Sequence, residues 1–503
     1  MIARLFTFAG GVKPDSHKVA SADAPIRPAP MPSRIVIPLH QGARAVARAL
    51  VKPGQTVLKG ETVAVADSAL ATNLHASTSG MVRAIELRPV PHASGIRVPC
   101  IVIEPDGRDE WIERTPVPWR SLPTDEVRDT LRDRGIVGLG GATFPSHIKL
   151  RPGPGEKGGF DTLILNGAEC EPWITCDDRL MRERADGILA GALAMRHIMG
   201  ARRILVGIED NKPEAIASMR AAVARSSDTC IEVATVPTRY PAGGEKQLIR
   251  VLTGIEIPYG KLGTHFGVQC FNVGTAHAIH RALDHGEPMV SRLLTLTGNV
   301  LRPGNFEVLL GTPVRELLPL SDPRPDTDRI LMGGPMMGIA LPDIDVPVVK
   351  GTNCVLVGSK ALFPPPAPEM PCIRCGACAR VCPAELQPFE LYWFSRAKIL
   401  GKAQEYHLFD CIECGCCAYV CPSRIPLVDY YRFAKSEIWA RERENEAAGT
   451  ARGRYEFRLA REERDKAEKA ARLAARAAET KAKLSQDAAA AVAAAVERTE
   501  TKS

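Results

Sequence analysis

Two cysteine-rich runs carry the clearest chemistry in the sequence: CIRCGACARVCP begins at Cys372, and CIECGCCAYVCP begins at Cys411. Both have the spacing CxxCxxCxxxCP, which is typical of chains that bind [4Fe-4S] clusters through thiolates. Three closely spaced thiolates can reach three irons of one cluster from a tight loop, and the proline turns the chain away after the fourth. In paired runs, the fourth cysteine of each run binds the cluster held by the other run.

The spacing therefore predicts two clusters with crossed ligation. The predicted ligands are Cys372, Cys375, Cys378 and Cys421 for the first cluster, and Cys411, Cys414, Cys417 and Cys382 for the second. Cys416 is the spare thiol, and a shift of ligation from Cys417 to Cys416 is an open alternative. Zinc is a weaker interpretation, because its usual signature is two separated CxxC pairs. A disulfide framework suits short secreted chains, whereas here nine of fifteen cysteines lie within fifty residues of a 503-residue chain.

Size and composition indicate several globular domains. The chain has 503 residues, of which 45% are hydrophobic and 24% charged, and single cores stop growing well below this length. The net charge of +7 is the difference between 65 basic and 58 acidic side chains, so it does not imply a nucleic-acid partner. The sequence has no uninterrupted apolar stretch long enough to span a membrane and no convincing signal peptide. We expect a cytoplasmic chain that does not itself cross a membrane.

The elements that position the cysteines begin, over residues 1–120, with an N-terminal extension and a small β domain. Short apolar runs such as RIVIPL (34–39), TVAVA (62–66) and MVRAIEL (81–87) are separated by glycine and proline turns. VKPGQTVLKGETVAV and HASTSGMVRAI resemble the barrel-sandwich hybrid of biotinyl and lipoyl carrier domains. The stretch between these two pieces contains no lysine that could be modified. We therefore expect a structural or docking role rather than a covalently loaded swinging arm.

Residues 121–262 are predicted to form a Rossmann-like α/β domain. Apolar strands at 162–168, 203–208 and 231–236 alternate with helical stretches. Strand, helix and strand at this spacing indicate a parallel sheet with right-handed crossovers.

The remaining regions give a multidomain chain of α/β and β parts. Residues 263–362 are expected to form a β-grasp module of the SLBB type, which contains the loop GGPMMG at 333–338. The proline-rich run FPPPAPEMP (363–371) is a semi-rigid spacer at the start of a ferredoxin domain with two [4Fe-4S] clusters, residues 363–434. Residues 435–503 are rich in Ala, Arg, Glu and Lys, which favour helix. We interpret this tail as a solvated or partly disordered helix, with a partner-binding helix as the alternative.

Three loops of the α/β domain predict a ligand site. GIVGLGGATFPSHIKL (135–150) precedes the first parallel strand, and its glycines allow a phosphate or a ring to approach the backbone near the cation of Lys149. NGAECEPWITCDDR (166–179) begins where that strand ends, and YPAGGEKQLI (240–249) opens a later helix. Ligands of open α/β sheets bind beyond the carboxyl ends of the strands, which is where the polar and acidic groups of NGAECEPWITCDDR are expected.

These loops resemble the NADH- and FMN-binding site of the flavoprotein of respiratory complex I, where they read GRGGAGFP, NADEsEP and GEE. From residue 5 to residue 435, the chain resembles the C-subunit family of the Rnf (Rsx) ion-translocating electron transport complexes. The resemblance runs through FAGGVKP, GLGGATFPSHIK, NGAECEP, PAGGEKQLI, GGPMMG and both cysteine runs. It implies FMN and NAD(H) as cofactors beside the two clusters. The residues implied to bind them are Gly138, Gly140, Gly141, Lys149, Asn166, Glu169, Glu171, Gly243, Glu245, Asn272 and Thr275.

Within this set, the resemblance gives Glu169, Glu171 and Glu245 positions facing the nicotinamide nucleotide or the flavin. It places the other residues around the flavin, except Gly243, which belongs to the glycine pair of the third loop. An alternative for Glu169 and Glu171 is a strand-end cap without a ligand. Three departures leave the nucleotide geometry open: Ala168 replaces an Asp of the complex I pattern, Gly244 replaces the first Glu of GEE, and Phe271 replaces an Asn. The nearby Cys170 and Cys176 have no third thiolate or adjacent histidine, so we expect ordinary thiols.

The resemblance implies a peripheral protein of a larger complex on the cytoplasmic face of the bacterial inner membrane. Such a protein exchanges hydride with NAD(H) through FMN and relays single electrons through two clusters, while integral membrane subunits couple electron transfer to ion translocation. Its implied partners are those subunits and a ferredoxin-type subunit. Cofactors carry this chemistry, so no catalytic side chain is expected. Two alternatives stay open: a soluble flavin and iron–sulfur reductase, such as a cobalamin reductase, and an electron-relay adaptor without a working nucleotide site.

Overall fold

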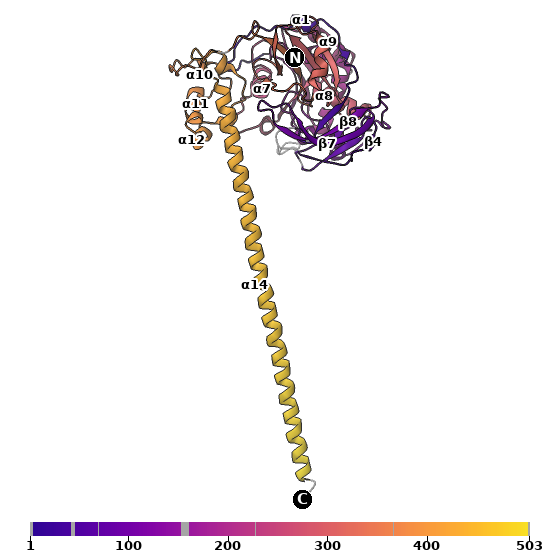
Figure 1. Ribbon diagram of the computed structural model, residues 1–503, viewed down its shortest axis with the longest axis vertical. Helices are drawn as coiled ribbons and strands as arrows, with labels where there is room; N and C mark the ends of the chain where they lie inside the picture. Colours follow the sequence, from indigo (N-terminus) through magenta and orange to yellow (C-terminus); the bar gives the residue numbers. More distant parts are fainter. Residues whose placement is uncertain are drawn as a thin grey trace. The chain divides into compact units, whose positions relative to one another are not determined.

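The computed structural model describes residues 4–41, 46–68, 70–151, 160–226, 228–365 and 367–500 (Figure 1). Contacts divide the chain into two units, Met1–Arg432 and Phe433–Ser503. The cysteine runs and the three loops all belong to the first unit. Among the described residues, no helix combines the length and the apolar character that a membrane crossing needs.

Two small antiparallel sheets form the N-terminal domain. The strands are β2 (Ile35–Pro38), β3 (Ala47–Ala49), β4 (Thr56–Val57), β5 (Thr62–Ala66), β6 (Leu74–His75), β7 (Gly80–Pro89) and β8 (Arg97–Pro105). One sheet has the order β2-β8-β7-β4, and the other has the order β3-β5-β6. Ile35 and Ile103 from the first sheet and Val63 from the second are fully buried in one shared apolar core. The predicted barrel-sandwich architecture is confirmed.

A four-stranded parallel sheet is the centre of the α/β domain. The elements are α2 (Thr124–Asp133), α3 (Ser146–Lys149), β9 (Thr162–Gly167), α4 (Cys176–Glu183), α5 (Ala185–Met199), β10 (Arg203–Glu209), α6 (Pro213–Arg225), β11 (Ile231–Val236), α7 (Glu245–Thr253), η1 (Gly263–Phe266), β12 (Val268–Asn272) and α8 (Val273–Asp284). The strand order is β11-β10-β9-β12, and every neighbouring pair runs parallel. The predicted α/β class is confirmed, with β12 as a fourth strand that the sequence pattern did not predict.

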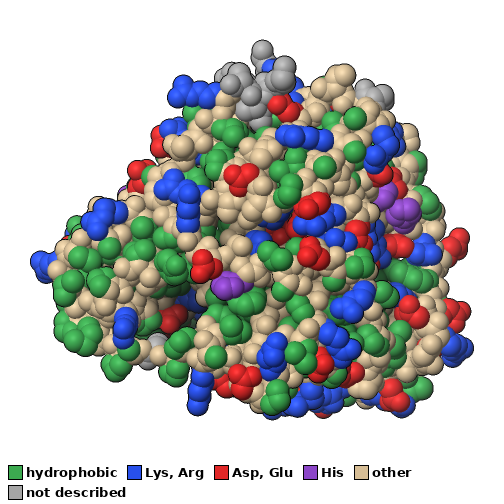
Figure 2. Space-filling model, turned by 90° about the horizontal axis from the view of Figure 1, so that it is seen from above, with side chains coloured by type: hydrophobic (Ala, Val, Ile, Leu, Met, Phe, Trp, Pro, Cys, Tyr) green, Lys and Arg blue, Asp and Glu red, His purple; other side chains and the backbone are tan. Residues whose placement is uncertain are grey.

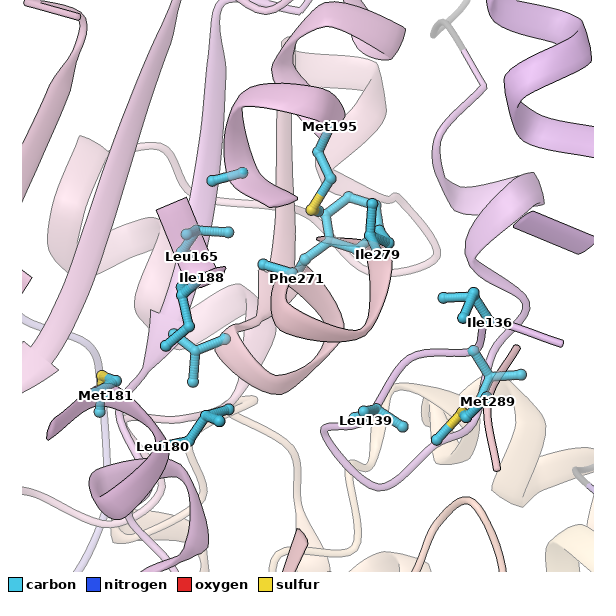
Figure 3. Close-up of a cluster of buried hydrophobic side chains, with 14 of the residues drawn as sticks. Ile136, Leu139, Leu165, Leu180, Met181, Ile188, Met195, Phe271, Ile279 and Met289 are labelled. Atoms are coloured by element: carbon cyan, nitrogen blue, oxygen red, sulfur yellow. The ribbon is translucent and has the colours of Figure 1, made fainter. Parts of the chain in front are cut away.

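The sheet separates two apolar cores because successive side chains of a strand point to opposite faces. Leu163 and Leu165 of β9 join one core with helices α5 and α8, whereas Ile164 joins the other core with α7. Figure 3 shows part of the first core, in which Leu165 lies near Ile188 of α5. Strands β9 and β12 end side by side, with Asn166 opposite Asn272. This register brings the ends of two polar loops to one edge of the sheet.

A six-stranded sheet forms the β-grasp module. Its elements are β13 (Ser291–Gly298), β14 (Gly304–Leu309), α9 (Val314–Ser321), β15 (Thr327–Met332), β16 (Ile339–Ala340) and β17 (Cys354–Ser359). The sixth strand, β1 (Arg27–Pro28), comes from the N-terminal extension after the short helix α1 (Val19–Ala22), and it pairs in parallel with β14. The N-terminal extension therefore runs past the sandwich domain and completes a sheet formed by residues far along the chain.

Short helices surround the cysteines. They are α10 (Ala377–Arg380), α11 (Pro388–Arg396), α12 (Leu400–Glu405), η2 (Leu408–Asp410) and α13 (Cys416–Tyr419). Of the proline-rich spacer expected before them, Pro366 lies outside the described residues.

The tail is one helix, α14 (Leu427–Glu500), which Figure 1 draws from orange to yellow. Its side chains from residue 441 to residue 498 are exposed. A continuous, solvated helix is one of the two interpretations of the sequence, and its alanine, glutamate and arginine content explains the conformation.

Candidate functional site

The two cysteine runs have the same backbone form. Arg374 and Glu413 occupy equivalent positions with φ of 55° and 57°, and Gly376 and Gly415 follow with φ of 72° and 79°. Each glycine is the N-cap of a one-turn helix, α10 in the first run and α13 in the second. The left-handed glycine lets the chain turn sharply into a helix that carries the third cysteine of its run.

Each run lines its own cavity and contributes its fourth cysteine to the other one. Cys372, Cys375, Cys378 and Cys421 line the first cavity. Cys382, Cys411, Cys414 and Cys417 line the second cavity, together with Cys416. The structure thus brings together the two crossed sets that the spacing predicted. Four thiols around one small cavity are a donor set that suits an iron–sulfur cluster.

The glycine-rich loop rests on the start of α8. The backbone N–H of Leu139 donates to the Thr275 hydroxyl at 2.9 Å, and the side-chain amide oxygen of Asn272 caps α8 by accepting from the Gly274 N–H at 2.8 Å. At Gly141, with φ of 110°, an added Cβ would meet no atom of the described residues within 4 Å. The loop therefore presents open backbone beside a helix N-terminus, an arrangement that suits a phosphate-bearing cofactor.

Asn166 joins the end of β9 to the loop that precedes α7. Its side-chain amide donates to the Gly243 carbonyl at 2.8 Å and accepts from the Ala168 N–H at 3.0 Å. A Cβ on Gly243 would lie 2.3 Å from the Ala168 carbonyl oxygen and 3.0 Å from Cys170 Sγ. Only glycine fits here, which explains the residue type in PAGGEK without a direct cofactor contact.

Lys149 and Glu245 meet across the same edge of the sheet. The Lys149 ammonium lies 2.6 Å from the Glu245 carboxylate and 5.1 Å from the centre of the Phe271 ring. Residues from two of the three loops therefore meet beside the end of β12. The ion pair itself was not expected, because it depends on packing between elements about a hundred positions apart in the sequence.

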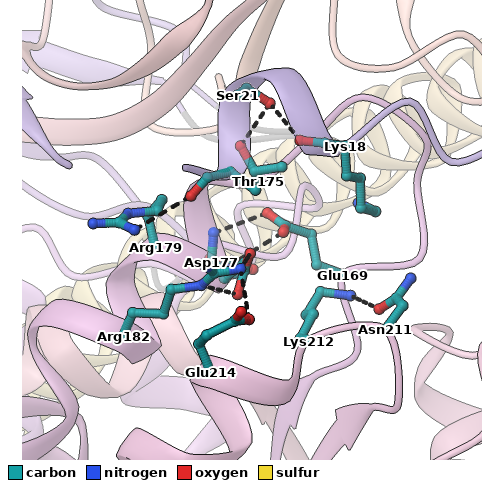
Figure 4. A network of polar contacts seen from close by, with 12 residues as sticks. Lys18, Ser21, Glu169, Thr175, Asp177, Arg179, Arg182, Asn211, Lys212 and Glu214 are labelled. Atoms are coloured by element: carbon teal, nitrogen blue, oxygen red, sulfur yellow. Dashed lines mark hydrogen bonds and ion pairs between the residues drawn. The ribbon is translucent and has the colours of Figure 1, made fainter. Parts of the chain in front are cut away.

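Glu169 caps a helix. Its carboxylate accepts hydrogen bonds from the backbone N–H groups of Asp177 at 2.8 Å and Asp178 at 3.3 Å, at the start of α4. Burial raises the pKa of Glu169 to about 7, and the nearby ammonium of Lys18 opposes the rise. Figure 4 shows Glu169 between Lys18 and the first turn of α4. These contacts correspond to the alternative in which Glu169 acts as a cap rather than as a cofactor ligand, here as a buried cap of α4.

Asp177 links this cap to the flavin-type loops, a connection that the sequence pattern did not predict. The Asn272 side-chain amide donates to the Asp177 carboxylate at 2.6 Å. Asp177 stands in the first turn of α4, where acidic residues are favoured. The acidic pair in ITCDDR was the available signal for this helix start.

The Glu171 side chain points in a different direction from that of Glu169. Its carboxylate accepts from the backbone N–H groups of Met336 at 2.7 Å and Met337 at 3.1 Å, within the loop GGPMMG. Its backbone carbonyl accepts from the Lys18 ammonium at 2.8 Å. Where we expected a side chain facing the nucleotide or the flavin, the structure turns Glu171 toward the β-grasp module, because that loop offers two N–H groups to its carboxylate.

The second cysteine cavity adjoins the α/β domain. The Tyr240 hydroxyl donates to the Cys414 carbonyl at 2.6 Å, and the Gln247 side-chain amide donates to the Pro383 carbonyl at 3.0 Å. The Lys246 ammonium lies 3.1 Å from the Asp410 carboxylate. All three donors come from the loop YPAGGEKQLI or the helix that it opens. One loop therefore contacts both the candidate cofactor residues and the walls of the second cavity.

Comparison with known families matches four consecutive regions. Models described as the RnfC barrel sandwich hybrid domain, the Nuo51 FMN-binding domain, the SLBB domain and the 4Fe-4S dicluster domain match residues 6–108, 131–281, 293–340 and 371–425. The predicted combination of domain types is confirmed.

Two solved structures of an NAD+-reducing [NiFe]-hydrogenase are also similar. The air-oxidized form has 20% identity and a TM-score of 0.45, covering 57% of this chain and 55% of that one. The H2-reduced form has 19% identity and a TM-score of 0.42, covering 65% and 63%.

Several curated relatives are named as the C subunit of an ion-translocating oxidoreductase complex. The Serratia proteamaculans protein is 45% identical over 466 residues, 92% of this chain and 65% of the relative. The Pseudomonas aeruginosa protein is 47% identical over 81% of this chain and 53% of the relative, so the chain spans between about half and two thirds of these two lengths. The Yersinia pestis protein is 44% identical over 92% of this chain and 74% of the relative. At this identity and coverage, the chain belongs to the family of C subunits of ion-translocating oxidoreductase complexes.

Proposed function

We propose that this chain is a peripheral electron-transfer component of a membrane-bound, ion-translocating oxidoreductase complex. In this proposal it exchanges hydride with NAD(H) at an FMN site and relays single electrons through two [4Fe-4S] clusters. Its partners are integral membrane subunits and a ferredoxin-type subunit, and it works on the cytoplasmic face of the bacterial inner membrane. The names of its relatives and its FMN-type and dicluster domains support the oxidoreductase assignment.

The observation that carries the proposal is the contact between the two kinds of site. Tyr240 and Gln247 belong to the FMN-type domain, and they hydrogen-bond to Cys414 and Pro383 in the wall of the second cavity. A chain with clusters alone would not need this connection. A flavin reductase without clusters would not need the eight crossed cysteines.

The residues around the glycine-rich loop fit FMN. Gly141 faces open space, Thr275 holds the loop against the N-terminus of α8, which Asn272 caps, and Lys149 supplies a cation at the same edge. FMN bound there would supply the conversion between two-electron hydride chemistry and single-electron transfer. The chain's own contribution is to hold the loops together, through Asn166 and the Lys149–Glu245 pair.

The crossed thiol sets fit two clusters, with Cys416 as the fifth thiol of the second cavity. Because the α/β domain contacts the walls of the second cavity, the cluster held by Cys411, Cys414, Cys417 and Cys382 is the one beside the flavin. The first cavity is the more open one, since Cys375 is exposed and Ile373, which also lines it, is 67% exposed. We assign the outer cluster to exchange with the partner carrier.

The surface around the first cysteine cavity also favours binding of a protein partner there. Figure 2 shows hydrophobic side chains gathered on the lobe at the left, where Figure 1 labels α10 and α11. Exposed apolar residues there include Met370, Ile373 and Ile399. On the rest of the viewed face, acidic and basic side chains are interspersed (Figure 2), which gives no footprint for nucleic acid.

Anaerobic reconstitution tests the cofactor part of the proposal. The full chain should bind FMN together with iron and sulfide for two clusters, and NADH should bleach the flavin. A folded, cluster-loaded chain that binds no FMN would instead be the electron-relay adaptor. Replacing Cys378 or Cys417 by alanine should remove one cluster's worth of iron in each case, and unchanged iron in both variants would overturn the ligand sets.

Purification from membranes tests the partner part. The chain should co-purify with integral membrane subunits from detergent-solubilised membranes, and its NADH oxidation should depend on an added iron–sulfur carrier. Recovery of an active enzyme from the soluble fraction without those subunits would favour the soluble flavin and iron–sulfur reductase.

A further inference from the structure

Cys416 makes the second cavity chemically different from the first. Its side chain is fully buried, and it lines the second cavity with Cys382, Cys411, Cys414 and Cys417. The equivalent position in the first run is Ala377, the first residue of α10, just as Cys416 is the first residue of α13. One cavity therefore has five thiols, and the other has four.

The backbone assigns the ligand roles among adjacent cysteines. In both runs, a left-handed glycine precedes the short helix, and the third cysteine of the spacing is the second residue of that helix: Cys378 in α10 and Cys417 in α13. Because the two loops have the same form, Cys417 takes the ligand position and Cys416 does not. The Cys416 thiol is therefore available to interact with a cysteine that binds the cluster, rather than binding the cluster itself.

The Cys416 thiol lies beside Cys414 in the wall of the second cavity. Around it lie Val12 and Tyr240, which belong with Cys414 and Cys416 to one buried cluster, and Met336 packs against them. A thiol is a weak S–H donor, and this enclosure shields the contact from competing water. The contact lies on the side of the cavity that faces the α/β domain, where Tyr240 bonds to the Cys414 carbonyl.

We propose that Cys416 is a positioning residue that donates an S–H hydrogen bond to the Cys414 sulfur and so raises the reduction potential of the second cluster. This inference rests on the proposed function, in which the second cavity holds a cluster. An added electron makes the cluster and its sulfur ligands more negative, so a hydrogen-bond donor to a ligand sulfur stabilises the reduced form more than the oxidised form. Two clusters bound by the same motif then differ in potential, and an electron arriving from the flavin side is held better on the nearer cluster.

The sequence supplies its own comparison for the experiment. Ala377 shows that alanine is compatible with this backbone position, so Cys416→Ala should fold and keep both clusters. Ala377 is only partly buried, so the reciprocal variant Ala377→Cys has room to place a thiol beside the first cluster. Cys416→Ser keeps a hydroxyl donor of similar shape at the original site.

The test is a redox titration of the reconstituted full chain, followed by electron paramagnetic resonance, with iron and sulfide determined on the same samples. In Cys416→Ala, both clusters should be present, and one midpoint potential should become more negative. A tenfold change in the reduction equilibrium corresponds to about 59 mV for one electron, and a shift of this order is expected. The other midpoint should stay in place, Cys416→Ser should shift less, and Ala377→Cys should move the other midpoint to a more positive value.

Each remaining outcome overturns a defined statement. Loss of half the iron in Cys416→Ala would show that Cys416 binds the cluster. Retention of all iron in Cys417→Ala would lead to the same conclusion. Full iron with both midpoints unchanged in Cys416→Ala would remove the tuning role while leaving the proposed function intact. A wild-type chain that binds one cluster or none would overturn the proposed function and the inference with it.

Discussion

Replacing Tyr240 by phenylalanine should loosen the contact between the second cysteine cavity and the α/β domain. The Tyr240 side chain is 2% exposed, and its hydroxyl donates to the Cys414 carbonyl at 2.6 Å. Phenylalanine keeps the ring that packs against Val12 and Cys416 but leaves that carbonyl without this donor. A buried acceptor that loses its partner costs about 1–3 kcal/mol. The contact should therefore weaken by roughly fivefold to more than a hundredfold, at 1.4 kcal/mol per factor of ten.

The assay compares two rates in the reconstituted chain by stopped-flow absorbance. Reduction of the flavin by NADH should be unchanged in Tyr240→Phe. Among the candidate cofactor residues the hydroxyl contacts Glu171, whose carboxylate is turned toward the GGPMMG loop and stays held by the Met336 and Met337 N–H groups. Reduction of the clusters after the flavin should be slower, because it depends on the contact. Tyr259→Phe is the matched control: its hydroxyl also donates to backbone carbonyls of the cysteine region, those of Ala384 and Glu385, but the side chain is 40% exposed. Equal cluster reduction rates in wild type and Tyr240→Phe, with equal thermal stability, would refute the reasoning.

Three further predictions concern the α/β domain and its junction with the β-grasp module. Burial alone would raise the pKa of Glu307, but Arg281 and Arg184 outweigh burial and lower this pKa from 4.5 to about 2. The ionised carboxylate therefore stabilises the folded state by about 3 kcal/mol, fully above pH 4.5 and less and less as the pH falls toward 2. Glu307→Gln should flatten this acid part of a plot of thermal stability against pH. Gly243→Ala should lower FMN content and cost about 1–3 kcal/mol of unfolding free energy, measured by flavin release and chemical denaturation, because the new Cβ meets the Ala168 carbonyl. Lys149→Met should reduce FMN content without changing iron content, since the cation lies at the flavin-type edge and lines neither cysteine cavity.

Matched controls test the locality of these effects. Glu104→Gln breaks an ion pair with Arg83 in which both side chains are about half exposed, so it should leave the acid limb of the stability profile in place. Gly449→Ala adds a Cβ on the exposed helix α14 that meets no atom within 4 Å in the part of the chain that the structure describes, and it should leave FMN content unchanged. An equal loss of FMN in Gly449→Ala and Gly243→Ala would contradict the proposed clash. Lys149→Met should be compared with Lys483→Met in the exposed tail. Equal FMN content in these two variants would show that Lys149 does not contribute to FMN binding.

Local spacing predicts some parts of this molecule better than others. The cysteine runs could be predicted from the sequence because their form depends on neighbouring residues: glycine turns, short helices and thiols three or four positions apart. The parallel sheet could also be predicted, because apolar strands and intervening helices repeat at a regular distance. The orientations of Glu169 and Glu171 could not be predicted in this way. They are two positions apart after the same strand, yet one caps α4 and the other reaches a loop more than 160 residues away. What decides between them is the packing of α4 and of the GGPMMG loop, which no local pattern encodes.

The same reason explains why the role of the N-terminal extension was missed. Lys18 is buried and donates to the Glu171 carbonyl 153 residues away, and β1 completes a sheet with β14. Nothing in the composition of the first thirty residues distinguishes them from a surface arm. The role of these residues depends on segments far along the chain that they contact, so it can be recognised only in the folded structure.

The opening motif FAGGVKP shows how the junction beside the second cavity is built. The Gly11 N–H donates to the Val381 carbonyl at 2.9 Å, and the neighbouring residue Val12 pairs through its backbone with Tyr240. A Cβ on Gly10 would lie 2.6 Å from backbone atoms of Cys382, so the segment can approach this predicted cluster ligand only as glycine. The extension is thus bonded by its backbone to the cysteine region on one side and to the α/β domain on the other. Because these bonds remain when the Tyr240 hydroxyl is removed, Tyr240→Phe should slow cluster reduction without abolishing it, whereas Gly10→Val, which pushes the two regions apart, should disrupt the junction as a whole.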